Sequence, residues 1–160
     1  MGHQAPDVKK ISALIKVLNG GIEFYQEGVE KIKEANLKAL FGQMIEEKQE
    51  AVASLQGFAV AEQGHTETQN DFGVEIRSMY TKLLGNFTSD MAHTYIEQLE
   101  EVEDKVLQSI DDALEVKQPT RCATELRRIR TRMQQCHDQM KWFKTESEKR
   151  RLSPALSRTS

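Results

Sequence analysis

The sequence predicts an all-α protein built as an antiparallel four-helix bundle. Four long stretches carry apolar residues at steps of three and four, the spacing that keeps one face of an α-helix against a core. The links within the first pair and within the second pair of predicted helices are short, whereas one long crossover joins the two pairs. A chain of 160 residues is long enough for these four helices to bury a single core.

The first helix is predicted to begin at Val8, with Asp7 as its N-cap. Its apolar stripe stays in phase across Gly20-Gly21, although each glycine costs about 1 kcal/mol relative to alanine. We interpret the two glycines as a site of close backbone packing or a mild bend, with a break into two helices as the alternative. The stripe consists of Val8, Ile11, Ile15, Leu18, Ile22, Tyr25, Val29 and Ile32.

The second helix is predicted to start behind an Asn36 cap and to end near Gly64. One charged residue, Lys48, occupies a place in its apolar stripe. The polar sequence GHTETQNDFG follows, and it is typical of a loop bounded by glycines. A short helix is predicted over 74–84. It is too short for a full member of the bundle, so we expect it to lie across the side or the end of the other helices.

The third helix is predicted over Thr88–Val116, with Thr88 or Ser89 as its cap, and the fourth begins with Pro119 in its first turn. The third carries nine acids and one lysine, a net charge of −8, whereas Lys117–Ser160 carries 12 basic and 4 acidic residues, a net of +8. We expect these antiparallel neighbours to neutralise each other. Residues 1–149 are predicted to form one domain, and residues 150–160 a disordered C-terminal tail.

The composition also indicates the cellular location of the protein and the state of its cysteines. No apolar run approaches the ~20 residues that span a bilayer, and the N-terminus lacks a signal-peptide core, so we expect a cytoplasmic protein without a membrane partner. Cys122 and Cys136 lie fourteen residues apart. On one helix this separation is about 21 Å of rise, beyond the reach of a disulfide. Both cysteines fall on an apolar stripe, so we expect buried, inert thiols.

A structural polar layer is predicted in the middle of the bundle. Placed by angle at ~100° per residue, Gln26, Lys48 and Glu103 are the polar side chains closest to the core, with His137 at the edge of its stripe. The Lys48 ammonium would repel a cation and can pair with Glu103 instead. We therefore expect no cofactor in this layer.

The alternative is a metal site. Four-helix bundles hold pairs of iron or manganese ions between inward-facing Glu and Glu-x-x-His residues. Glu47 and Glu50 have the spacing that places two side chains on one helix face. The protein would then be a di-metal carboxylate oxidoreductase or a metal-binding bundle. Its ligands would be Glu27, Glu47, Glu50, Glu100, Glu103 and His137.

A second alternative is nucleic-acid binding through the basic fourth helix, which would depend steeply on salt. We favour internal pairing with the acidic helix that precedes it. The arginines concerned are Arg121, Arg127, Arg128, Arg130 and Arg132.

Three segments resemble the helices of a bacterial ferritin-like four-helix-bundle family of unknown function, in the same order and with similar lengths. They are LNGGIEFYQEGVEKIKEANLKALFGQMIEEKQEAVASL, YIEQLEEVEDKVLQSIDDAL and RMQQCHDQMKWF, within residues 8–145. The resemblance implies a ferritin-like fold, an association with stress responses and no established catalytic activity. Di-iron ferritin relatives have Glu-x-x-His in two helices. Here the pairs are Glu47-x-x-Glu50 and Gln134-x-x-His137, and both depart from that pattern.

The favoured interpretation is a non-enzymatic, ferritin-like bundle protein of the cytoplasm. We expect it to act by binding a protein partner or by assembling into a homo-oligomer.

Overall fold

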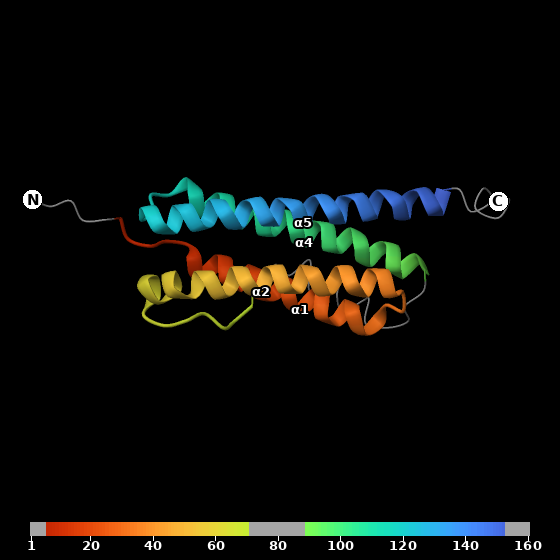
Figure 1. Ribbon diagram of the computed structural model, residues 1–160, viewed down its shortest axis with the longest axis horizontal. Coiled ribbons are helices and arrows are strands. Elements are labelled where there is room, and N and C mark those ends of the chain that lie inside the picture. The colour runs from red at the N-terminus through yellow and green to blue at the C-terminus, as the bar shows by residue number, and fades with distance from the viewer. Residues whose placement is uncertain (1–5, 71–88, 153–160) are drawn as a thin grey trace, which may run out of the picture.

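The computed structural model describes residues 6–70 and 89–152, and this part of the chain contains four α-helices and no β-strand (Figure 1). The helices form an elongated bundle, as predicted. Their bounds are Ile11–Lys31 for α1, Ala35–Gln63 for α2, Ser89–Glu115 for α4 and Thr120–Leu152 for α5. None of the helices in the described ranges is long and apolar enough to cross a membrane.

The bundle consists of two helical hairpins. Helix α1 packs most extensively on α2, and α4 on α5, while α1 on α4 and α2 on α5 join the hairpins. The chain reverses direction within each hairpin, and the long crossover then makes α4 run parallel to α2 (Figure 1). The contact between α2 and α5 is the least extensive of the four, which leaves a seam along one side of the bundle.

The apolar stripes of all four helices meet in one core. Cys122 and Cys136 are both buried and unbridged, as predicted. Helix α1 is continuous through Gly20-Gly21, so the alternative of a break there is wrong. A Cβ atom on Gly21 would lie 3.3 Å from Cγ1 of Val102 and 3.4 Å from Cδ and Cε of Lys48. The prediction of close packing is therefore confirmed at Gly21.

The predicted start of the first helix at Val8, behind an Asp7 cap, is wrong. Helix α1 begins three residues later, and its N-cap position is held by Lys10, which has a left-handed φ of 63° and no side-chain cap. The cap comes from another helix. The Glu62 carboxylate, at the end of α2, accepts hydrogen bonds from the backbone N–H groups of Lys10, Ile11 and Ser12 at 3.1, 3.0 and 2.8 Å. An acid at this end also interacts favourably with the helix dipole.

The other helix ends follow the predictions more closely. Helix α2 begins at Ala35, so the predicted Asn36 cap is wrong and Glu34 takes the N-cap position. Its end is confirmed at Gly64, whose φ of 90° suits glycine and whose N–H donates to the Val60 carbonyl at 2.8 Å. Helix α5 starts directly after Pro119 and continues to Leu152, three residues into the predicted tail. The helix predicted over 74–84, the Thr88 cap and residues 153–160 lie outside the described residues.

Candidate functional site

A cluster of buried polar side chains lies between three helices. Lys48 on α2 and Glu103 on α4 are completely buried, and the Lys48 ammonium forms an ion pair with Oε1 of Glu103. The hydroxyl of Tyr25, which is also completely buried on α1, donates a hydrogen bond to the same oxygen at 2.6 Å. We call Tyr25, Lys48 and Glu103 the buried triad. It links both hairpins of the bundle through charge as well as packing.

The surroundings of the triad favour a positive charge at the Lys48 nitrogen. Nζ lies 4.9 Å from the centroid of the Tyr25 ring, a distance at which the ring face attracts a cation. The lysine stem runs past Gly21, where the missing side chain leaves room for it. Within the described residues, Oε2 of Glu103 is buried and accepts no hydrogen bond. The triad therefore has one unused acceptor.

Tyr25 of the triad and the thiols of the two buried cysteines are held in their neutral forms. Burial is the main cause that raises the pKa of Tyr25 well above its ordinary value, and the negative charge of Glu103 adds to it. Burial likewise raises the pKa of the Cys136 thiol to about 11, although nearby Lys48 opposes this. Burial and the charge of Glu62 raise the pKa of Cys122 to about 11. At neutral pH the phenol is a hydrogen-bond donor and the thiols are not nucleophiles.

The structure brings Lys48 and Glu103 together, as the sequence analysis proposed, but the assignment of Gln26 to the layer is wrong. Gln26 is exposed, and its neighbour Tyr25 faces the interior instead. The buried face of α1 includes Leu14, Gly21 and Gly28, so it is turned away from Gln26 relative to the predicted stripe. Tyr25 was treated as an apolar stripe residue. The hydroxyl of a tyrosine in the stripe could have identified it as a member of the polar layer, because a buried tyrosine usually finds a hydrogen-bond partner.

Three of the proposed metal ligands lie in ion pairs away from the triad. Glu47 and Glu50 both contact the guanidinium of Arg132 on α5, at 2.8 and 3.1 Å. Glu100 on α4 pairs with Lys144 on α5 at 2.8 Å. These carboxylates join helices to one another.

The remaining candidates are also dispersed. His137 contacts Asp104 of α4 through Nε2 at 2.5 Å, and its Nδ1 lies 3.5 Å from Asp138. Glu27 is half-buried on the outer side of α1. Of the six candidates only Glu103 is completely buried, and it forms an ion pair with Lys48. Within the described ranges, no group of three or more His, Cys, Asp or Glu side chains could hold a metal ion.

Three arginines of the basic helix α5 form ion pairs with other described residues. Arg130 pairs with Asp111 of α4 at 2.6 Å, Arg128 pairs with Glu125 on its own helix, and Arg132 contacts α2 as described. The contacts that join the acidic helix α4 to the basic helix α5 are Arg130 with Asp111, Lys144 with Glu100 and His137 with Asp104, and these three agree with the expected pairing of the two helices. They also reduce the positive potential that would attract a nucleic-acid phosphate.

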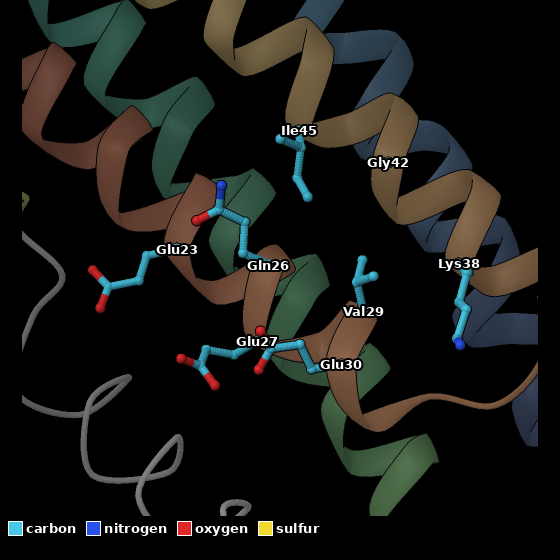
Figure 2. Close-up of a pocket in the computed structure, with 8 residues that line it drawn as sticks. All are labelled: Glu23, Gln26, Glu27, Val29, Glu30, Lys38, Gly42 and Ile45. Carbon is cyan, nitrogen blue, oxygen red and sulfur yellow. The ribbon is translucent and has the colours of Figure 1, made fainter.

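The outer side of the α1–α2 hairpin carries a groove with a volume of about 470 Å³ (Figure 2). Carboxylates line its α1 wall, and α2 supplies an apolar and a basic side chain. Neither Glu27 nor Glu30 forms an ion pair or hydrogen bond with any other described residue. We call this surface the α1–α2 groove, and its lining residues are Glu23, Gln26, Glu27, Val29, Glu30, Lys38, Gly42 and Ile45.

A second groove, of about 340 Å³, follows the seam between α2 and α5. Glu47 and Arg132 lie on its walls, and Cys136 contributes to its lining. Cys136 is buried, and the charges of Lys48 and Glu103 both act on the pKa of its thiol. We call it the α2–α5 groove.

A buried acid that the sequence analysis missed, Glu67, fixes the loop after α2. Its carboxylate accepts hydrogen bonds from the Ser12 hydroxyl at 2.5 Å and the Gln69 N–H at 3.1 Å, and lies 3.6 Å from the Lys16 ammonium. Its backbone exchanges two hydrogen bonds with the side chain of Gln56. The bond from Ser12 is the main cause that lowers the pKa of Glu67, while burial opposes it. These partners lie far apart in sequence, so no local signal marks them.

Replacing Glu67 with glutamine is expected to lower the free energy of unfolding at neutral pH by about 1.5–3 kcal/mol, the range for hydrogen bonds to a charged group. The pKa of Glu67 is lower in the folded than in the unfolded chain. Its charge therefore stabilises the fold above the ordinary glutamate pKa of about 4.3, and this contribution disappears as the pH falls through the folded value. Denaturant titrations at a series of pH values should show the two proteins converging in acid. The same substitution at exposed Glu46 is the control, and an equal loss there would contradict the assignment.

Comparison with protein families matches residues 7–116 to a domain of unknown function, DUF2383. The match covers α1, α2 and α4, and so includes all three residues of the buried triad. No curated protein and no solved structure matches the chain.

Proposed function

The chain belongs to the DUF2383 family, which is defined by a domain of unknown function, and we propose that it is a non-enzymatic, ferritin-like four-helix-bundle protein that acts by binding a partner or assembling with itself. In this proposal it is a protein of the cytoplasm with a role in stress responses, as the resemblance of its helices implies. The observation that carries the non-enzymatic assignment is the completely buried ion pair of Lys48 with Glu103.

A fixed ammonium in the interior opposes metal chemistry there. Two unit charges 4 Å apart repel by about 4 kcal/mol at an effective dielectric constant of 20, and a divalent cation would roughly double this. Lys48 also neutralises the charge of Glu103, the one completely buried acid among the proposed metal ligands. The protonated thiols of Cys122 and Cys136 supply no nucleophile. The interior groups therefore support a structural role.

The surface supports a binding role. The α1–α2 groove combines a concave shape with carboxylates that no described side chain neutralises, Glu27 and Glu30 among them. Such a surface favours a partner that carries positive charges. A second copy of the chain offers exposed arginines on α5, Arg121 and Arg127.

Oxidation of ferrous iron under air tests the non-enzymatic assignment. We expect the protein to leave the oxidation rate at that of buffer, and a Glu103→Gln variant to behave in the same way. Faster oxidation by the wild type that is lost in the variant would contradict the proposal and favour a di-metal oxidoreductase.

Sedimentation velocity at low and high salt, with and without oligolysine as a cationic probe, tests the binding role. We expect self-association or probe binding that weakens with salt and is lost in Glu27→Lys/Glu30→Lys. The control is Glu46→Lys/Glu101→Lys, which makes the same charge change at exposed positions outside the groove. A wild type that stays monomeric and does not bind the probe would contradict the binding role, as would equal losses in both variants.

A further inference from the structure

Within the buried triad, the groups around the Lys48 ammonium are of the kind that bind an ammonium ion in a ligand site. Glu103 supplies an ion-pairing oxygen, and Tyr25 supplies the face of its ring. Gly21, also on α1, has no side chain and so leaves space for the lysine stem. We propose that this is an ammonium-binding site whose occupant is the chain's own Lys48, and that removal of the Lys48 side chain opens it to a small primary alkylammonium ion. This inference concerns the interior and is independent of the surface role proposed above.

Charge recognition comes from Glu103 and Tyr25. Oε1 of Glu103 accepts hydrogen bonds from both the ammonium and the Tyr25 hydroxyl. The phenol is therefore a donor that orients the carboxylate, and it does not compete with the carboxylate as an acceptor for the ammonium. A primary ammonium has three donors. The buried Oε2 of Glu103 accepts no bond from a described residue, so a second donor of a mobile ammonium has an acceptor available. Ring face and carboxylate together select a cation over a neutral group of the same size.

Size recognition comes from the space that the lysine stem occupies. The stem packs beside Gly21, where even a Cβ atom would lie 3.4 Å from Cδ and Cε. A Lys48→Ala substitution would remove Cγ, Cδ, Cε and Nζ, which together correspond to n-propylammonium. Close-packed interiors do not readily collapse into a space of this size, so the substitution leaves a cavity with a carboxylate at its end.

In this proposal the ligand enters through the α2–α5 groove. It lies along the least extensive helix contact of the bundle and includes Cys136 in its lining. An incoming cation would also pass Glu47, an acid on the groove wall.

Thermal unfolding of Lys48→Ala in n-propylammonium chloride tests the proposal. The melting temperature should rise with ligand concentration, as expected for a ligand that binds only the folded state. n-Propanol and sodium chloride at matched concentrations control for cavity filling and ionic strength. We expect n-propylammonium to bind at least about tenfold more tightly than n-propanol, since a charge-assisted hydrogen bond supplies at least this factor. If Lys48→Ala is unfolded alone, recovery of helical circular dichroism with n-propylammonium is the readout.

Two further variants make the test specific. Lys48→Met keeps most of the stem volume, so it should gain nothing from n-propylammonium. Lys48→Ala/Glu103→Gln keeps the cavity but lacks the carboxylate charge, so its preference for n-propylammonium over n-propanol should disappear. Equal stabilisation of Lys48→Ala by n-propanol would overturn the proposal, because the site would then be only a cavity. Failure of n-propylammonium to stabilise or refold Lys48→Ala would also overturn it.

Discussion

Replacing Lys48 with methionine is expected to lower the free energy of unfolding by about 3–5 kcal/mol, the cost of removing one partner of a buried ion pair. Methionine fills most of the same space, so the loss reports charge more than packing. Glu103 would keep only the hydrogen bond from Tyr25, in a place with no access to solvent. Urea denaturation at neutral pH measures the difference.

The matched control for this prediction is the double variant Lys48→Met/Glu103→Leu. Replacing both charges by apolar side chains removes the desolvation cost together with the attraction, so its stability should equal or exceed that of the wild type. Glu103→Leu alone should be destabilised, because the ammonium would then be buried without a counter-charge. A Lys48→Met variant within about 0.5 kcal/mol of the wild type, the usual effect of a surface substitution, would contradict the assignment of a buried ion pair.

Gly28→Ala is the second substitution with a large expected effect. An added Cβ atom would lie 2.6 Å from Cε1 and 2.7 Å from the hydroxyl oxygen of Tyr95. The Tyr95 ring stacks on Phe24 at a centroid distance of 4.8 Å, and its hydroxyl donates to the Phe24 carbonyl. The ring cannot withdraw without losing both interactions, so we expect a loss of about 1–3 kcal/mol, the usual cost of overpacking.

Gly57→Ala is the control for the glycine prediction. Gly57 also lies inside a helix, but a Cβ atom there would meet nothing within 4 Å. Alanine should therefore stabilise α2 by up to about 1 kcal/mol, the difference in helix propensity. The two substitutions are chemically identical and should change the urea midpoint in opposite directions. A stabilising Gly28→Ala would contradict the close approach of Tyr95 to α1.

Helical periodicity was sufficient to predict the bundle and two of its buried charged residues, Lys48 and Glu103. Lys48 occupies an apolar place in its stripe, and Glu103 lies beside Val102 between apolar neighbours one turn away. Positions on a regular helix follow from ~100° per residue, so both could be located before the neighbouring helices were known. Gln26 was assigned wrongly and Tyr25 was missed, because α1 is rotated slightly from the ideal phase and a tyrosine counts as apolar in such a stripe.

Contacts between distant segments could not be predicted in this way. The carboxylate of Glu62 caps a helix that begins about 50 positions earlier, and Glu67 binds Ser12 across a similar separation. Both acids follow an ordinary polar pattern in the sequence, and only the packing of α1 on α2 gives them their roles. The same holds for Glu47, Glu50 and Arg132, whose ion pairs depend on the contact of α2 with α5. The spacing of Glu47 and Glu50, which resembles that of metal ligands, gives no information about their pairing with Arg132.

Lys48 and Glu103 form an ion pair in the interior, and we assign this pair a structural role. Elemental analysis of protein purified without chelator or affinity metal, before and after anaerobic loading with ferrous iron, tests it most directly. We expect metal far below one ion per chain in the wild type, and no difference in a Glu103→Ala variant that remains folded. About two iron or manganese ions per chain, the stoichiometry of a two-metal site, present in the wild type and lost in the variant, would contradict it.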